Sequence, residues 1–191
     1  MGVGTALNAA LNASARAVFL DRDGVLNRAI VRDGKPYPPA SLDELEIVEN
    51  AAGSLRLLKD LGFLLLVVTN QPDVARGTSS RALVDAIHER LRDLLPLDAI
   101  LACFHDDADE CECRKPRPGL LLRAAGDLRI DLSLSFMIGD RWYDVEAGKR
   151  AGCRTVLVGR GYDEQATITC DFCVGSLMEA AAIIIRESDS R

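Results

Sequence analysis

The sequence predicts a doubly wound α/β fold, in which helices cover both faces of a parallel sheet. Two apolar runs, Ala17–Leu20 and Phe63–Val68, are typical of strands that are buried on both faces. Segments with helical spacing of apolar residues alternate with such runs, which implies right-handed β-α-β crossovers. Polar residues follow each predicted strand, as expected where parallel strands deliver side chains to one edge of a sheet.

The first strand runs directly into two aspartates. Asp21 and Asp23 follow the apolar run, and Gly24 then allows a sharp turn of the backbone. Two like charges held this close require a cation or a shared proton. Because a lone Asp-x-Asp is more often a strand end with solvated carboxylates, the rest of the chain decides its role.

A long loop is predicted after the aspartates. Residues 28–42 contain Gly34, Pro36, Pro38 and Pro39, a composition that excludes a continuous helix or a central strand. About fifteen residues is long for a strand-to-helix connection. We therefore expect a lid or a specificity element over the strand ends.

The second unit of the fold begins with a helix that Asn50 is predicted to cap and Gly62 to end. The strand that follows ends on Thr69 and Asn70. Further elements are predicted in order: a helix from Ser80 to Leu94, a strand over 99–102 ending at Cys103, a helix over 119–128, a strand over 136–138 followed by Gly139-Asp140, a helix over 145–151, a strand over 155–158, and a helix opened by the capping-box spacing of residues 176–179.

Length and composition favour one compact domain. The chain has 191 residues, of which 48% are hydrophobic, and a formal net charge of −6. We expect a flexible leader over 1–16, a single domain over 17–186 and a tail over 187–191. The acidic balance argues against nucleic acid as a partner. No export signal or apolar run long enough for a membrane is visible, so we expect a cytoplasmic monomer that acts on a small molecule.

The strand ends together offer the groups that phosphoryl transfer needs. Asp21, Asp23 and Asp140 would give a hard cation too few oxygens to fill its shell, which leaves positions for water and a substrate phosphate and describes a Mg²⁺ site. Thr69 and Lys115 could hold the remaining oxygens of a phosphoryl group. Each part alone has a simpler interpretation, since most such threonines lie in turns and most lysines are solvated.

The order of these motifs resembles that of the haloacid dehalogenase superfamily of phosphatases, from about Ala17 to Val158. Within that superfamily, four stretches are similar to the heptose-bisphosphate phosphatases and to the histidinol-phosphate phosphatases: TNQ (69–71), ARG (75–77), CRKPRPG (113–119) and GDRWYDVEAGKRAG (139–152). Two positions depart from the heptose enzymes, which commonly have Ser-Gly where this chain has Pro72-Asp73 and often have lysine in place of Arg141.

The resemblance implies a role for each aspartate. Asp21 would attack phosphorus and form an aspartyl-phosphate. Asp23 would protonate the leaving alcohol and then activate water, a double role for which we expect a raised pKa. Mg²⁺ would bind the carboxylate of Asp21, the main-chain carbonyl of Asp23, and Asp140.

The resemblance also assigns the groups around the reacting phosphate. Thr69 and Lys115 would stabilise the phosphoryl group, and Asp144 would orient Lys115. Substrate contacts are expected from five further residues: Arg28, Asn70, Gln71, Arg114 and Arg141.

A cluster of cysteines predicts a structural zinc site. Cys103, His105, Cys111 and Cys113 provide four thiolate and imidazole ligands, the set that zinc prefers. The alternative is three buried thiols beside a surface histidine, but the acidic residues over 106–110 make this loop too polar for a core. The zinc would hold the loop that carries Arg114 and Lys115.

The other cysteines and the second histidine receive structural interpretations. With no export signal, the cysteines are expected to be reduced. Cys170 and Cys173 are expected to pack, because residues three apart on a strand face opposite ways. Cys153 is predicted in the core, and His88 beside an apolar helical stripe is interpreted as structural.

Three functions are compatible with these residues. The first is a Mg²⁺-dependent phosphatase for heptose 1,7-bisphosphate at the 7-position, a step in lipopolysaccharide precursor biosynthesis. The second is a histidinol-phosphate phosphatase, favoured by the five-residue gap between His105 and Cys111. The third and most remote is a non-catalytic, zinc-stabilised binding protein. Because neither 28–49 nor 71–98 can hold a cap domain, we expect a capless enzyme whose substrate is recognised by loops.

Overall fold

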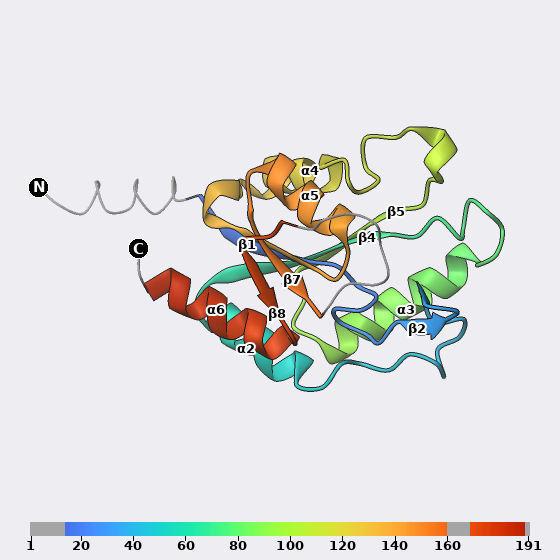
Figure 1. The fold of residues 1–191 in the computed structure, drawn as a ribbon, viewed down its shortest axis with the longest axis horizontal. Coiled ribbons are helices and arrows are strands. Elements are labelled where there is room, and N and C mark those ends of the chain that lie inside the picture. Colours follow the sequence, from blue (N-terminus) through green and yellow to red (C-terminus); the bar gives the residue numbers. More distant parts are fainter. Residues whose placement is uncertain (1–13, 160–168, 190–191) are drawn as a thin grey trace, which may run out of the picture.

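The computed structural model describes residues 14–159 and 169–189 of the chain. A six-stranded sheet with the order β5-β4-β1-β6-β7-β8 forms its centre (Figure 1). All neighbouring strands in it are parallel. The strands are β1 (Arg16–Leu20), β4 (Phe63–Asn70), β5 (Ala99–Cys103), β6 (Phe136–Gly139), β7 (Arg154–Val158) and β8 (Phe172–Val174).

Helices cover both faces of this sheet, so the predicted doubly wound α/β architecture is confirmed (Figure 1). One face carries α2 (Ala51–Asp60), α3 (Arg81–Leu94) and α6 (Leu177–Asp189), and the other carries α4 (Gly119–Leu128) and α5 (Trp142–Ala151). Short 3₁₀ turns occur at Asp107–Asp109 and Leu132–Leu134.

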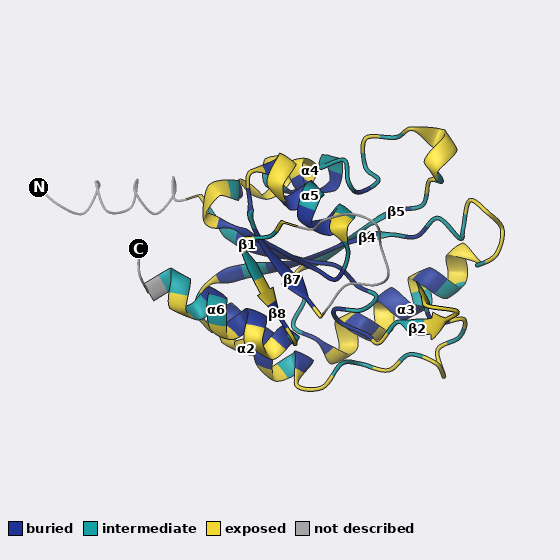
Figure 2. Ribbon diagram, in the orientation of Figure 1, coloured by how far each residue is buried: buried dark blue, intermediate teal, exposed yellow. Residues whose placement is uncertain are grey.

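Strand β1 is apolar without alternation because both of its faces are buried in the core. Val18 and Leu20 pack into the core on the α2 side, whereas Ala17 and Phe19 pack into the core on the α4 side. All four are fully buried, and Figure 2 shows the strands of the sheet as largely buried between exposed outer helix faces. Asp21, the next residue along the chain, is thereby held at the carboxyl edge of the sheet.

The ends of helices α2 and α3 agree with the predicted ends in all but one detail. Gly62 ends α2 with a φ of 84°, and the Ser80 hydroxyl caps α3 by accepting from the amide of Leu83. Asn50 lies at the N-cap position of α2, but its backbone is left-handed and its side chain makes no capping hydrogen bond. Asn50 therefore occupies the predicted position, but the predicted capping hydrogen bond from its side chain is wrong.

The long connection after the aspartates contains a small hairpin. Strands β2 (Ile30–Arg32) and β3 (Lys35–Tyr37) pair with each other and stay outside the main sheet. In the described part of the chain, residues 28–49 hold this hairpin and no larger insertion, which agrees with a capless enzyme.

The expected domain boundaries are only partly visible. Residues 1–13 of the predicted leader lie outside the described residues, and Arg16 belongs to β1. Helix α6 continues to Asp189, so the predicted start of the tail falls inside a helix. Within the described residues, no helix combines the length and the apolar character needed to cross a membrane.

The structure joins Cys170 and Cys173 in a disulfide, contrary to the expectation of packed, reduced thiols. The prediction placed both cysteines on one strand, but β8 begins only at Phe172. Because Cys170 precedes the strand, the strand rule that separates side chains three residues apart does not apply. Cys153 is buried in the core on the α4 side, as predicted.

Candidate active site

A cavity of about 430 Å³ opens at the carboxyl ends of the central strands. It receives groups from the ends of β1, β4 and β6, from the β2–β3 hairpin and from the loop before α4. Its lining includes Asp21, Asp23, Tyr37, Thr69, Asn70, Gln71, Asp73, Arg76, Asp107, Arg114, Lys115, Asp140, Arg141, Trp142 and Tyr143.

Lys115 forms the charged floor of this cavity. Its ammonium lies 2.8 Å from Asp21 Oδ1 and 2.5 Å from Asp144 Oδ1, and it donates to the carbonyl of Val68 at 2.7 Å. The Lys115 side chain is fully buried. Burial alone would lower the pKa of Lys115, but the carboxylates of Asp144 and Asp21 outweigh it and raise that pKa. The lysine is therefore a fixed positive charge, and Asp144 orients it as expected.

Three carboxylates lie close together beside Lys115. Oxygens of Asp21, Asp140 and Asp144 all lie within 4.8 Å of one another, and all three residues are buried. The close approach depends on Gly139, since a Cβ there would lie 2.1 Å from the Cβ of Asp144. A cluster of buried carboxylate oxygens at the cavity fits a hard cation such as Mg²⁺.

Asp23 lies beside the cluster and is held by three neighbours. Its carboxylate accepts from Arg22, from Asn27 Nδ2 at 3.0 Å and from Gln71 Nε2 at 3.0 Å. Burial opposes ionisation, but the Arg22 guanidinium and these hydrogen bonds outweigh it and lower the pKa of Asp23. The expectation of a raised pKa is therefore wrong for the ligand-free protein. The prediction considered the neighbouring carboxylate and left out Arg22.

The residues at the end of β4 support the site in different ways. Thr69 lines the cavity, and its hydroxyl accepts from Gln71 Nε2 at 2.9 Å. The Asn70 amide makes two hydrogen bonds to the backbone of Lys115, both 3.0 Å long. Asn70 therefore fixes the loop that carries the lysine, and a direct contact between Asn70 and substrate stays a prediction.

Arg76, Arg114 and Asp107 line the rim of the cavity, and Asp106 pairs with Arg76 beside them. Arg114 Nε donates to Asp107 Oδ1 at 2.7 Å, and Arg76 pairs with both Asp106 and Asp107. These contacts connect the loop after β4 to the loop of the cysteine cluster. The Arg76 guanidinium and the hydrogen bond from the Asp107 amide lower the pKa of Asp106 to about 2.

The remaining predicted substrate residues differ in position. Arg141 lines the cavity, with its guanidinium 5.0 Å from the ring centroid of Tyr143. Arg28 is exposed, pairs with Glu46 at 2.7 Å and is not part of the cavity lining. A role for Arg28 in substrate binding therefore has no geometric support in this conformation.

Several cavity residues were missed by the sequence analysis. Tyr37 and Trp142 contribute aromatic side chains to the cavity lining, and Arg76 contributes a cation. Arg76 lies within the ARG stretch that the sequence analysis quoted, so that signal was available. Trp142 lies within the quoted stretch over 139–152, so a signal was available for it as well. Tyr37 carried none, because its approach depends on how the β2–β3 hairpin folds back over the strand ends.

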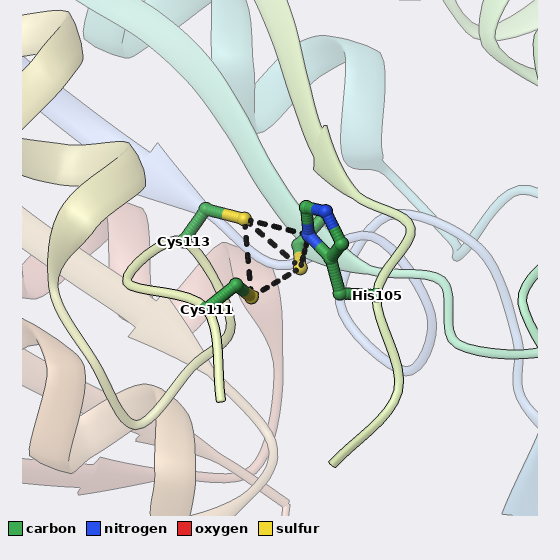
Figure 3. Close-up of side chains that lie close together, drawn as sticks. His105, Cys111 and Cys113 are labelled. Atoms are coloured by element: carbon green, nitrogen blue, oxygen red, sulfur yellow. Dashed lines mark hydrogen bonds between the residues drawn. The ribbon is translucent and has the colours of Figure 1, made fainter. Parts of the chain in front are cut away.

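The cysteine cluster assembles as predicted (Figure 3). The Sγ atom of Cys113 lies 3.2 Å from that of Cys103 and 3.4 Å from that of Cys111, and 3.2 Å from Nδ1 of His105. Four ligands at zinc distances of about 2.0 to 2.3 Å lie roughly 3.3 to 3.8 Å apart in a tetrahedron. The donor set and its spacing thus fit a four-coordinate zinc ion.

Three parallel strands bring Asp21, Thr69 and Asp140 to one edge of the sheet, and the loop before α4 adds the buried Lys115. This arrangement defines a phosphatase site of the haloacid dehalogenase type. The profile of the HAD-hydrolase-like family matches residues 112–180, which include Lys115, Asp140 and Asp144.

Similar proteins extend this match over most of the chain. The D-glycero-β-D-manno-heptose-1,7-bisphosphate 7-phosphatase of Pasteurella multocida is 39% identical over 158 residues, covering 76% of this chain and 83% of that protein. The enzyme of the same name from Escherichia coli K12 is 34% identical over 190 residues, with coverages of 91% and 96%.

A solved structure agrees with these matches. The D,D-heptose 1,7-bisphosphate phosphatase of B. bronchiseptica, complexed with magnesium and phosphate, superposes with a TM-score of 0.78 at 30% identity, covering 90% of this chain and 99% of that one. The chain belongs to the haloacid dehalogenase superfamily, in the family of these heptose bisphosphate phosphatases, and it is a phosphatase. The resemblance inferred from the motifs is confirmed.

Proposed function

We propose that this protein hydrolyses a sugar phosphate through an aspartyl-phosphate on Asp21. The observation that carries the proposal is the position of the Asp21 carboxylate at the cavity floor, 2.8 Å from the buried Lys115 ammonium. An oxygen of Asp21 can attack phosphorus while Lys115 and Thr69 bind the phosphoryl oxygens that gain charge. Asp21, Asp140 and the Asp23 carbonyl would hold Mg²⁺, which supplies further positive charge to the phosphoryl group.

Asp23 would move the protons in both halves of this reaction. Its lowered pKa leaves it ionised in the free protein, which suits the second step, where a carboxylate activates water against the aspartyl-phosphate. To protonate the leaving alcohol in the first step, Asp23 must gain a proton as substrate binds. The negative charge of the arriving phosphate favours that change.

The substrate we propose is heptose 1,7-bisphosphate, cleaved at the 7-position. Support comes from the names of the similar enzymes and from the rim, where Arg76 and Arg114 offer guanidinium groups to a second phosphate. Tyr37 and Trp142 provide aromatic surface for a sugar between the two phosphates. This reaction would place the protein in lipopolysaccharide precursor biosynthesis.

A phosphate-release assay tests the choice of substrate. The panel contains the α and β anomers of D-glycero-D-manno-heptose 1,7-bisphosphate, histidinol phosphate, fructose 1,6-bisphosphate and glucose 6-phosphate. We expect a heptose bisphosphate to have the highest kcat/KM, with the 1-phosphate retained in the product. A higher kcat/KM for histidinol phosphate would assign the second function predicted from the sequence.

Arg114 is the rim residue whose loss should reveal recognition of a bisphosphate. We expect Arg114→Ala to lower kcat/KM for the bisphosphate by one to two orders of magnitude, about 1.4 to 2.7 kcal/mol. p-Nitrophenyl phosphate has no second phosphate, so its kcat/KM should stay near that of the wild type. Arg123→Ala removes an equal charge from α4, outside this cavity, and should leave kcat/KM for both substrates unchanged. An equal fall for both substrates in Arg114→Ala would mean that Arg114 serves the reacting phosphoryl group.

We further propose that the cysteine cluster binds one structural zinc ion. All four positions of the tetrahedron are filled by protein, which leaves no open position for catalysis. The zinc would anchor the loop that carries Arg114 and Lys115 into the cavity.

Protein purified without chelators is therefore expected to contain one zinc ion per chain by elemental analysis. Cys111→Ser should lose that zinc and make the segment around Arg114 sensitive to protease, because the loop would no longer be tied at its base. Mg²⁺ affinity should change much less. Cys153→Ser, a thiol in the core away from the cluster, is the matched control and should retain zinc. Zinc-free protein with an intact, protease-resistant loop would contradict the assignment.

A further inference from the structure

Arg22 connects the proposed acid–base carboxylate to a histidine outside the cavity. Its side chain is fully buried, and its Nε and Nη2 atoms both donate to the Asp23 carboxylate. The remaining guanidinium nitrogen, Nη1, lies 3.2 Å from His88 Nε2. Because an arginine can only donate, His88 must accept this hydrogen bond, which places its ring proton on Nδ1.

His88 can accept because its ring is neutral. It lies on α3, where the other buried residues are apolar, and it is itself buried. Burial, and next the charge of Arg22, lower the pKa of His88 to about 4. The apolar residues that surround it on α3 would fill the same space, but they could not accept a hydrogen bond from Arg22.

The same guanidinium also fixes Gln71. Arg22 Nη2 donates to Gln71 Oε1 at 3.1 Å, which orients the amide so that its Nε2 faces the other way. That Nε2 donates to Asp23 at 3.0 Å and to the Thr69 hydroxyl at 2.9 Å. Asp23 and Thr69 stand on the cavity wall, so one buried guanidinium orders groups that would face the leaving oxygen and the phosphoryl oxygens.

We propose that His88 is a positioning residue for catalysis: by accepting from Arg22, it fixes the guanidinium that holds Asp23 and Gln71 in place. A planar guanidinium bound to a partner at only one edge can pivot about that contact, whereas a second anchor at Nη1 removes this freedom. Positioning matters because proton transfer requires the carboxyl within hydrogen-bond reach of the leaving oxygen. The inference rests on the acid–base role of Asp23 proposed above.

Two aryl phosphates with different leaving groups distinguish a positioning role of His88 from a general structural role. Phenolate is a poor leaving group and needs a proton from Asp23, whereas p-nitrophenolate leaves without one. The quantity to measure is kcat/KM, which reports formation of the aspartyl-phosphate and is independent of the preference for heptose. Phenyl phosphate and p-nitrophenyl phosphate therefore test the proton donor without depending on the proposed substrate.

Removal of the acceptor should lower kcat/KM much more for the substrate with the poor leaving group than for the other. We expect His88→Leu to lower kcat/KM for phenyl phosphate about tenfold, a part of the 10²- to 10⁴-fold that a general acid supplies, and to change that for p-nitrophenyl phosphate less than twofold. His88→Gln places an amide oxygen near the position of Nε2 and should restore both values to within about threefold of the wild type. Leu91→Val creates a small cavity on the same helix. It should change kcat/KM for the two substrates by the same factor.

A second variant guards against misfolding of His88→Leu. His88 borders a surface pocket of about 440 Å³, so free imidazole can reach the space left in His88→Ala. Imidazole should raise kcat/KM for phenyl phosphate selectively in this variant. Equal losses for both substrates, no loss at all, or no rescue by either glutamine or imidazole would overturn the proposal.

Asp23→Asn distinguishes a failure of the His88 positioning role from a failure of the acid–base role proposed for Asp23. It should lower kcat/KM for phenyl phosphate far more than that for p-nitrophenyl phosphate. If it does and His88→Leu does not, the positioning role alone is wrong. If Asp23→Asn affects both substrates equally, the acid–base role of Asp23 is wrong and the inference falls with it.

Discussion

Replacement of Asp21 by asparagine is expected to lower kcat by more than a thousandfold, over about 4 kcal/mol in the barrier, while the fold stays intact. The amide has nearly the shape of the carboxylate and its oxygen can still accept from Lys115, but it cannot attack phosphorus. Steady-state phosphate release measures the loss, and the urea midpoint of unfolding measures the fold.

The control for this variant is Asp127→Asn, which makes the same change at an exposed position on α4. It should match the wild type in both measurements. Mass spectrometry has to exclude deamidation of the introduced asparagine back to aspartate. Activity of an intact Asp21→Asn protein near that of the wild type would remove the nucleophile assignment.

The second large effect is expected from Lys115→Met, in both stability and activity. The Lys115 and Asp144 side chains are fully buried, and burial already raises the pKa of Asp144 to about 7. Loss of the ammonium therefore leaves a buried carboxyl group that has no cation to stabilise its charge. Breaking a buried pair in this way costs about 3 to 5 kcal/mol in the free energy of unfolding. Activity should fall at least about a hundredfold, because the transferring phosphoryl group loses a preorganised positive charge.

A double variant separates the two consequences of losing Lys115. In Lys115→Met/Asp144→Asn the unpaired charge is gone, so most of the lost stability should return while activity stays low. Urea unfolding in the presence of a chelator for Mg²⁺ compares the wild type with the single and double variants. A single Lys115→Met variant as stable as the wild type would mean that the lysine does not compensate these carboxylates.

The sequence allowed the centre of the site to be predicted because its groups follow directly from strands. Asp21, Thr69 and Asp140 each come within one residue of an apolar run that is buried between two layers, so the fold itself brings them to one edge. The clustering of Cys103, His105, Cys111 and Cys113 could also be predicted, because four such donors lie close together in the sequence on one short polar loop.

Features that depend on how loops fold back could not be predicted in this way. The pKa of Asp23 was misjudged because the backbone forms a tight turn after β1, in which the Arg22 carbonyl accepts from the amides of Leu26 and Asn27. The Arg22 guanidinium contacts the Asp23 carboxylate at this turn. Arg28 is adjacent in sequence but pairs with Glu46 instead of reaching the cavity. The Cys170–Cys173 disulfide was missed because the strand proved shorter than its apolar pattern indicated.

The position of β1 in the sheet separates the part of the enzyme that must stay fixed from the part that can change. Its residues are paired on both sides, and the amide of Asp21 adds a bond to Ile138 of β6, so this segment can open only if the whole domain unfolds. The rim arginines belong to loops beyond β4 and the edge strand β5, and their contacts are side-chain ion pairs to Asp106 and Asp107. Mutations that alter substrate preference can therefore accumulate at the rim at little cost to the nucleophile, and a new specificity can evolve on an unchanged reaction centre.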